Sequence, residues 1–500
     1  MTTSAIGGSG AAGSSRAELA MWAAVAASVL LIPIELGWVA ALQYAWGFTL
    51  WEYLPGAGCV VLTGLVLLFC WRAPREIALR VLRASHGALE RPSSWPLRWA
   101  AVAVVPALLW MLREREFLGD SKIILYATAT SDAAFHFPDI GATYLLQQGF
   151  NLGQLLGVGG LNGVQALVCA TAALAVLCFA KLGGYLAPSR RRAAFGATLI
   201  LCGGVMRIFA GHIEVYSFVV VCLGVYLCYA FAYLEGRRNW FALSLAAGVG
   251  IWIHLSFLFL LPSLLLLPLL VETRPRGELV KQWTLGLVIA AAPIISFFVF
   301  MWLGGHASDV EKAWAKLLRW SVVGPTPGGH EAWIRPWGKD GAGTRYALFS
   351  WRHLKYLANS FFILAPAIVP VVATFALISP RRLVSTPQTA FLSCACATLI
   401  LYAIIVRPVM GPYDWDLFSI TAVSLGALAA HLLTQDLESR PLAQLSILLV
   451  AVTLLFVTIP FLIVGIHPGA HRGPFAIDAL TGAENGSWET TFEQHLAPWL

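Results

Sequence analysis

The sequence predicts an all-α membrane protein whose chain crosses the bilayer about thirteen times. Hydrophobic residues make up 58% of the 500 residues and charged residues only 12%, and the mean hydropathy is +0.74. A water-soluble fold of this length would carry more charge at its surface. Several apolar runs also reach the roughly 20 residues that a helix needs to cross the hydrocarbon core. Together these observations exclude a soluble globular domain.

The net charge of +7 does not indicate a nucleic-acid partner. The basic residues stand in short loops between apolar runs, a pattern that orients a membrane protein with its positive loops in the cytoplasm. We therefore expect a multi-pass protein of the cell (inner or plasma) membrane, with its amino terminus inside and its carboxyl terminus outside. The inner loops are predicted at five basic clusters: residues 72–98, 189–192, 235–238, 274–276 and 381–382.

The first 95 residues are predicted to precede the functional part of the chain. Residues 1–19 are rich in Gly, Ser and Ala, and we expect them to be disordered. Residues 20–95 are predicted to form an additional amino-terminal transmembrane hairpin and a basic cytoplasmic loop. The first span carries one acid, Glu35, to which the sequence assigns no role.

The predicted transmembrane core covers residues 96–434, and its first span leads to the outer loop 113–154. This loop holds ionisable residues in otherwise lipid-soluble surroundings: Asp120, Lys122, Asp132, His136 and Asp139. Such groups are costly at a membrane boundary unless they have water, partners or a function. Asp120 therefore either takes part in chemistry or, with Ser121, caps a helix that begins at Lys122. A short interfacial helix is also expected, from Pro138 to a cap at Gly149.

Two spans near residues 155–181 and 194–210 lead to a polar motif on the outer face, Gly211-His212-Ile213-Glu214-Val215-Tyr216. The apolar run 240–271 that comes later is basic on both flanks, so a single crossing would violate the charge rule. Two short crossings that meet near His254 satisfy it.

A span near residues 283–303 leads into the long outer loop 304–355. Within this loop Val310, Trp314 and Leu317 recur at helical spacing, which predicts an amphipathic helix in the interface. Further spans near 356–378, 390–406 and 417–433 complete the core, and residues 435–500 hold a last span and an outer tail.

This topology gathers carboxylates and imidazoles at the outer ends of several helices, where one cavity would collect them. We interpret Asp120 and Glu214 as catalytic, and a second set as substrate-binding: Lys122, Asp132, His136, His212, His254, Arg407 and Asp414. Structural alternatives stay open for them. Glu214 lies seven residues after Arg207 and could pair with it, His212 could simply lie in the interface, and His254 could hydrogen-bond a loop carbonyl.

The segment 407–416 offers both a cation and a carboxylate pair. Arg407 could bind phosphate at a helix end, or anchor its span by reaching the headgroups. Asp414 and Asp416 resemble the aspartate pairs that hold Mg²⁺ or Mn²⁺. Alternatively, Asp416 caps the helix that begins at Leu417.

A sugar linked to a phosphate would use all of these groups. A carboxylate can act as general base for the acceptor hydroxyl, and Arg or Lys can stabilise the negative charge that grows on the leaving phosphate. If the phosphate is carried by an isoprenoid, the membrane spans provide an apolar groove for the chain.

The pattern resembles the GT-C class of integral-membrane glycosyltransferases, which includes protein O-mannosyltransferases and the aminoarabinose transferase of lipid A. The resemblance rests on Gly119-Asp120 in an early outer loop, on the motif 211–216, on the hairpin 240–271 and on the long loop 304–355. It implies a GT-C fold and an inverting transfer from a polyprenyl-phosphate sugar to a glycan, lipid or protein acceptor outside the cytoplasm. It also implies that Asp120 is the base and Glu214 a second acid.

The sequence departs from this class in two ways. About two spans precede the one that carries the acidic loop, which suggests an added amino-terminal hairpin. Ser121 follows Asp120 where many members have a second acid, which weakens the case for a metal at Asp120. A divalent cation, Mg²⁺ or Mn²⁺, is left open as a cofactor with no ligands assigned.

Two other functions fit the composition. A transporter or flippase of a lipid-linked or small polar substrate would carry ionisable residues near mid-membrane, and Glu35 and Arg207 are the strongest such residues. A scaffold subunit of an envelope-synthesis complex would not need the acids, which counts against it.

Overall fold

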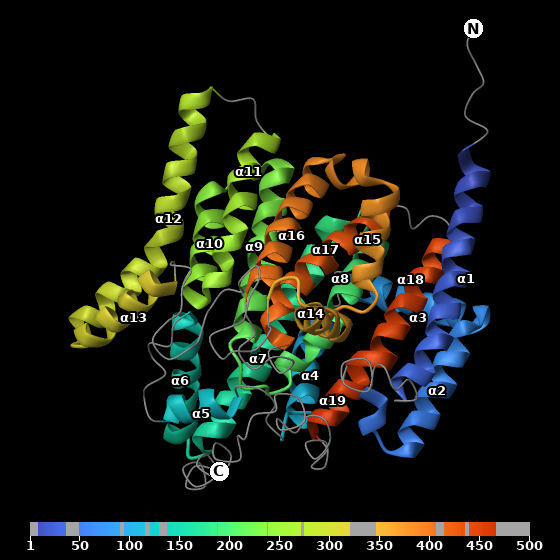
Figure 1. The fold of residues 1–500 in the computed structure, drawn as a ribbon, viewed down its shortest axis with the longest axis horizontal. Coiled ribbons are helices and arrows are strands. Elements are labelled where there is room, and N and C mark those ends of the chain that lie inside the picture. The colour runs from blue at the N-terminus through green and yellow to red at the C-terminus, as the bar shows by residue number, and fades with distance from the viewer. Residues whose placement is uncertain are drawn as a thin grey trace.

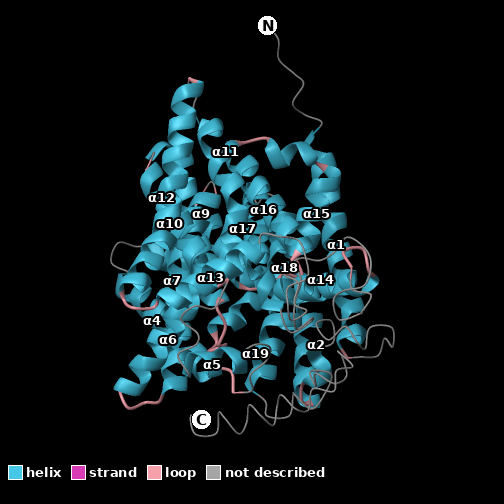
Figure 2. Ribbon diagram, turned by 60° about the vertical axis from the view of Figure 1, so that its left-hand side comes forward, coloured by secondary structure: helices cyan, strands magenta, loops and turns pink. Residues whose placement is uncertain are grey.

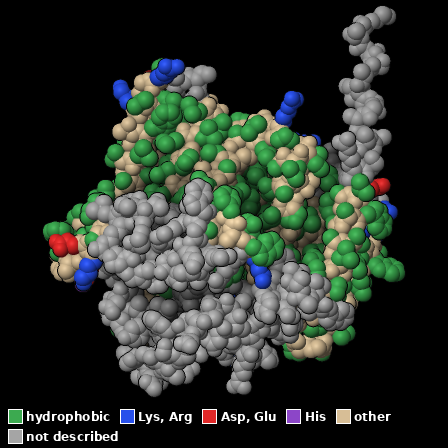
Figure 3. All heavy atoms as spheres, viewed as in Figure 1, with side chains coloured by type: hydrophobic (Ala, Val, Ile, Leu, Met, Phe, Trp, Pro, Cys, Tyr) green, Lys and Arg blue, Asp and Glu red, His purple; other side chains and the backbone are tan. Residues whose placement is uncertain are grey.

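The computed structural model describes residues 9–36, 50–90, 95–115, 121–129, 138–187, 189–237, 239–271, 275–320, 347–406, 415–435 and 440–466. These residues fold into a bundle in which helices account for nearly all regular structure (Figures 1 and 2). In Figure 3 hydrophobic side chains are spread over the whole described surface, where Lys and Arg side chains are few and scattered. The predicted all-helical, multi-pass class is confirmed.

Seven described helices are long and apolar enough to cross a membrane, or up to nine if each of two bent pairs is one span. Three shorter apolar helices cover Val102–Met111, Trp240–Ile253 and Leu255–Val271. The finer count of about thirteen spans stays a prediction.

The amino-terminal hairpin packs against the last helices of the described chain. It consists of α1 (Ser9–Glu35), the short 3₁₀ turn η3 (Leu50–Tyr53), α2 (Gly56–Cys70) and α3 (Arg72–Glu90). Figure 1 shows it beside α18 (Arg440–Thr453), the π-turn η12 (Leu454–Thr458) and α19 (Ile459–Ile466). Helix α1 begins at Ser9, inside the segment 1–19 that was predicted to be disordered.

A sharp bend separates α2 from α3. The two helices meet at 89°, and Arg75 donates to the carbonyl oxygens of Phe69 and Cys70, both at 2.7 Å. These are among the last carbonyls of α2, which have no partner within the helix. Arg75 therefore fixes the direction in which α3 leaves the span.

The core surrounds α17 (Ser419–Gln435), which is buried along almost its whole length. Its neighbours are α7 (Gly160–Leu186), α8 (Arg190–Leu201), the 3₁₀ helix η6 (Gly204–Phe209), α9 (Tyr216–Ala232) and α16 (Pro387–Ile405). Helix α4 (Trp95–Met111) packs on α7, and the π-turn η7 (Tyr233–Arg237) ends α9. This arrangement brings the ends of α4, η6 and α17 together.

The run 240–271 breaks where the hairpin prediction requires. Helix α10 (Trp240–Ile253) ends at His254, whose backbone is extended (φ −158°, ψ 133°). The 3₁₀ turn η8 (Leu255–Leu260) and α11 (Leu261–Val271) follow, and α12 (Arg276–Leu303) packs along α10.

The segments predicted to lie outside contain α5 (Ser121–Ala129), α6 (Ile140–Leu155) and α13 (Ala307–Trp320), so the expected helices are present. Two boundaries differ from prediction. Helix α6 continues past Gly149 to Leu155. Gly149 lies within the helix, where it packs against Leu167 of α7. The predicted span 356–378 is bent by 110° between α14 (Trp351–Leu364) and α15 (Ile368–Ile378), since Pro366 removes an N–H and disfavours a helical Ala365.

Candidate functional site

Three segments that lie far apart in sequence meet beside α7. A hydrogen bond joins the residues after α4 to the loop before α9: the backbone N–H of Glu114 donates to the carbonyl oxygen of Ala210, at 2.8 Å. Gln165 of α7 then joins the two segments, because its amide nitrogen donates to the carbonyl oxygens of Glu114 (2.8 Å) and Gly211 (3.2 Å). The third segment is the 3₁₀ turn η11 (Trp415–Phe418) that opens α17.

Gly211 is required by this junction. Its φ is +65°, and a Cβ atom there would lie 2.8 Å from the Cβ of Arg113. A side chain would therefore be strained by the backbone and would also push the two segments apart.

The side chains of these segments form a buried chain of charges. Arg207 Nη2 lies 2.8 Å from one oxygen of Glu114, and His212 Nδ1 lies 2.6 Å from the other. His212 Nε2 lies 3.3 Å from Asp416 Oδ2, so the imidazole bridges two carboxylates. All four side chains are at most 5% exposed.

The two carboxylates control the protonation of His212. Burial on its own lowers the pKa of this imidazole, but Glu114 and Asp416 more than offset that effect and raise the pKa to about 9. In the absence of a metal His212 is therefore an imidazolium at neutral pH, and both ring nitrogens donate.

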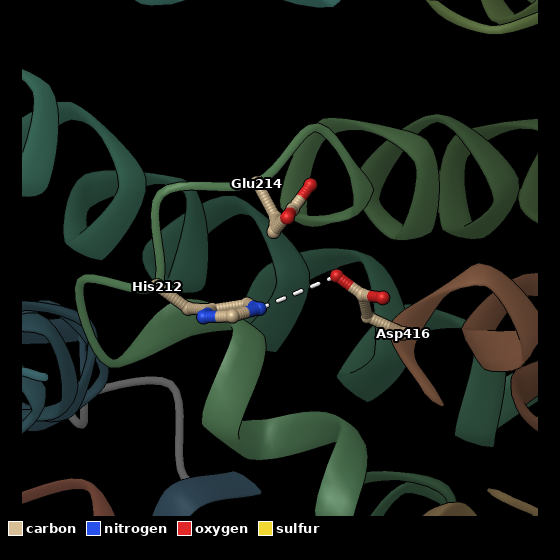
Figure 4. Close-up of side chains that lie close together, drawn as sticks. All are labelled: His212, Glu214 and Asp416. Carbon is tan, nitrogen blue, oxygen red and sulfur yellow. Dashed lines mark hydrogen bonds and ion pairs between the residues drawn. The ribbon is translucent and has the colours of Figure 1, made fainter. Parts of the chain in front are cut away.

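Glu214 completes a group that could hold a metal ion. One ligand atom each from His212, Glu214 and Asp416 lies within 4.8 Å of the others (Figure 4). An imidazole with two carboxylates suits a divalent cation, and the imidazole favours Mn²⁺ over Mg²⁺, which prefers oxygen ligands. With Nε2 on a cation, Nδ1 would donate to Glu114, the usual arrangement for a metal-bound histidine.

A second polar region adjoins this group. His254 Nδ1 accepts from the backbone N–H of Ser256 at 3.0 Å, and the His254 ring lies 5.4 Å from that of Tyr216. Tyr216 is within electrostatic range of Asp139, Glu214 and Asp416. The break at His254 is tied to the start of α6 by a hydrogen bond from Leu255 N to the Pro138 carbonyl, at 3.2 Å.

The structure thus brings His212 and Glu214 together and places His254 against Tyr216, two residues after Glu214. Lys122 lies in α5, but its side chain is outside the described part of the chain. The remaining predicted site residues lie outside the described residues: Asp120, Asp132, His136, Arg407 and Asp414.

One alternative left open by the sequence is resolved, because the ion pair of Arg207 is with Glu114 and not with Glu214. Asp416 lies inside the 3₁₀ turn η11, and α17 begins at Ser419, so Asp416 does not cap a helix that begins at Leu417. Its Oδ1 accepts from the backbone N–H of the next residue, Leu417, at 3.0 Å, while Oδ2 faces His212.

Glu114 and Gln165 were missed by the sequence analysis. Glu114 follows an apolar run and stands between Arg113 and Arg115, which is typical of a charged span end. The signal that could have identified it is position, since it is the first acid after the span that leads into the acidic loop.

No protein-family model and no curated protein sequence matches this chain. Among solved structures, it is similar to ArnT from Cupriavidus metallidurans bound to undecaprenyl phosphate, at 14% identity over 77% of this chain and 79% of that one, with a TM-score of 0.48. It is also similar to the archaeal oligosaccharyltransferase AglB from Archaeoglobus fulgidus, in complex with an inhibitory peptide and a dolichol-phosphate, at 13% identity over 68% and 51%, with a TM-score of 0.38.

Both proteins are of the GT-C class that the sequence motifs resemble. The identities and TM-scores are too low for this likeness to assign a function, which has to come from the side chains of the site.

Proposed function

We propose that this chain is a GT-C-like glycosyltransferase that moves a sugar from a polyprenyl-phosphate donor to an acceptor on the extracytoplasmic side of the cell membrane. The observation that carries the proposal is the buried group of His212, Glu214 and Asp416, held in place by Glu114. A sugar phosphate needs a positive charge at its leaving group, and this donor set is suited to supplying one as a bound cation.

The residues of the group would hold Mn²⁺ or Mg²⁺, which supplies Lewis-acid stabilisation of the leaving phosphate when bound. Glu214, interpreted from sequence as a catalytic acid, is in this proposal a ligand together with His212 Nε2 and Asp416. Glu114 keeps the imidazole oriented by accepting from Nδ1, and Arg207 compensates the charge of Glu114.

Asp120 is the proposed general base, which takes the proton of the acceptor hydroxyl as that oxygen attacks the sugar carbon. A single displacement of this kind inverts the configuration at that carbon. The next residue supports a position near the group, since Ser121 Oγ lies 3.5 Å from His212 Nδ1. Glu114 is less suited to proton removal, because each of its oxygens already faces Arg207 or His212.

The other predicted residues are proposed to contact substrate. Lys122 and Arg407 would bind the donor phosphate, and the other predicted polar residues would bind sugar or acceptor hydroxyls: Asp132, His136, His254 and Asp414. A glycan, a lipid or a protein can each provide such an acceptor hydroxyl, and the donor lipid would lie between helices.

The test supplies purified protein with a radiolabelled polyprenyl-phosphate sugar and Mn²⁺ and follows transfer or slow hydrolysis. Wild type should turn over, chelation by EDTA should stop it, and Asp120→Asn should lose most of the rate while still folding. Full activity of Asp120→Asn would remove the base assignment. Activity kept in Asp120→Asn but lost in Glu214→Gln, with Mn²⁺ binding retained in Glu214→Gln, would move that role to Glu214.

A further inference from the structure

The last described helix reaches the site through one aromatic residue. Phe461 of α19 is fully buried, and its carbonyl oxygen accepts from Arg207 Nη1. The guanidinium carbon of Arg207 also lies 4.4 Å over the Phe461 ring. The Phe461 and Trp415 rings pack edge-to-face, with the ring centroids 4.7 Å apart.

These contacts act on both carboxylates that hold His212. Arg207 is the cation paired with Glu114, at 2.8 Å. Trp415 precedes Asp416 in η11, and its ring lies 5.4 Å from the imidazole of His212. Movement of Phe461 would therefore shift Arg207 with Glu114 on one side, and η11 with Asp416 on the other.

The position of Phe461 depends on the π-turn η12 that precedes α19. A π-turn places one extra residue in a helical turn, so the face presented by the following residues is rotated. It also frees carbonyl groups from the ordinary helical pattern. Trp51 Nε1 donates to one of them, the carbonyl of Leu455, at 3.1 Å.

Trp51 comes from the amino-terminal hairpin. Its ring stacks on Phe456 in the same π-turn, with centroids 4.9 Å apart and planes 7° from parallel. Its backbone N–H donates to Glu35 at 3.4 Å, so the acid without an assigned role supports the tryptophan. On the other side of the π-turn, Thr458 Oγ1 donates to the carbonyl of Cys202, next to η6.

We propose that Phe461 is a positioning residue for the His212 group, and that the amino-terminal hairpin holds it in place through Trp51. Phe461 fixes Arg207 and Trp415, which in turn fix Glu114 and Asp416. The inference gives the added hairpin a function, and its activity readout rests on the proposed glycosyltransferase function.

The experiment compares Phe461→Leu with Phe391→Leu in the full-length purified protein. Phe391 of α16 is equally buried and packs against Tyr226 and Phe231, which lie in the second half of α9, away from the end of α9 that follows His212. The same atoms are removed, so both variants should lose similar stability. Only Phe461→Leu should weaken Mn²⁺ binding, by about tenfold, and lower kcat by about tenfold with little change in donor KM.

A milder variant covers the case in which Phe461→Leu does not fold. Trp51→Phe keeps an aromatic ring on Phe456 but removes the indole N–H that donates to Leu455, together with part of the buried ring system. It should weaken Mn²⁺ binding and lower kcat, each by about threefold. If Phe461→Leu matches Phe391→Leu in both readouts, or if the milder variant leaves both unchanged when Phe461→Leu is unfolded, the inference is overturned.

The two proposals can fail separately. Wild type that binds Mn²⁺ but transfers no sugar would overturn the glycosyltransferase function, and the Mn²⁺ titration of the variants would still decide the role of Phe461. Wild type that neither binds Mn²⁺ nor transfers sugar would overturn both.

Discussion

Replacing Glu114 with Gln separates an orienting carboxylate from a catalytic base. The substitution keeps the size of the side chain but removes the charge that faces Arg207 and His212 at 2.8 and 2.6 Å. Breaking a buried ion pair from one side costs about 3–5 kcal/mol, because the remaining charge stays buried and uncompensated. The amide oxygen still accepts one hydrogen bond, so we expect unfolding to become easier by about 3 kcal/mol.

Glu114→Gln should weaken Mn²⁺ binding more than it slows the transfer step at saturating Mn²⁺. Losing the partner of a metal-bound histidine typically weakens metal affinity by about 10–100-fold. If Glu114 only orients His212, Glu114→Gln should therefore regain most of its transfer rate when Mn²⁺ is raised to saturation. A variant that has lost the general base, as proposed for Asp120→Asn, should stay slow at every Mn²⁺ concentration.

The assay measures transfer of a radiolabelled sugar against Mn²⁺ concentration, with Mn²⁺ affinity from titration and stability from thermal unfolding. Asp309→Asn is the control, since Asp309 pairs with the exposed Lys312 at 3.3 Å and its loss should change stability by less than about 1 kcal/mol. An unchanged Mn²⁺ affinity in Glu114→Gln, or a rate that saturating Mn²⁺ does not restore, would refute the orienting role.

Three further predictions concern the same junction. Mn²⁺ must displace the proton of His212, whose pKa is raised to about 9. The affinity for Mn²⁺ should therefore rise by up to about tenfold per pH unit below pH 9 and then level off. An Mn²⁺ affinity that does not change from pH 7 to 9 would contradict this. Gly211→Ala should destabilise more than Gly157→Ala, which also has a positive φ but nothing within 4 Å of the added Cβ; equal unfolding temperatures would contradict the close approach. Gln165→Leu leaves two carbonyls without their donor and should cost about 2 kcal/mol in a denaturation assay with reduced transfer; wild-type stability would exclude the bridging role.

The fold class and much of the outer polar motif could be predicted from the sequence. Apolar length and loop charge predicted helical spans, and charge on both flanks predicted the break near His254, which the structure shows at that residue. The pairing of His212 with Glu214 in one region followed from their spacing in one loop. These features are local, because each depends on a short stretch of sequence.

The features that could not be predicted depend on contacts between distant segments. Glu114 and Asp416 are 302 residues apart in the chain numbering, and only the meeting of α4 with η11 beside His212 makes them partners of one imidazole. The same holds for Phe461, where an unremarkable apolar run becomes part of the site because a π-turn rotates its face. The spacing of apolar residues does not predict a π-turn, because a π-turn is one inserted residue within an otherwise helical pattern.

The formal charges of the described site are compatible with the proposed divalent cation. Counted at their formal charges, the carboxylates of Glu114, Glu214 and Asp416 outnumber the cations Arg207 and protonated His212, so one negative charge is in excess among these buried residues. If the proton of His212 is exchanged for a divalent cation, the described group becomes neutral. A buried group is most stable when its charges are compensated, which favours the exchange. No negative ligand charge is then left over to repel the donor phosphate, so the bound cation can still attract it.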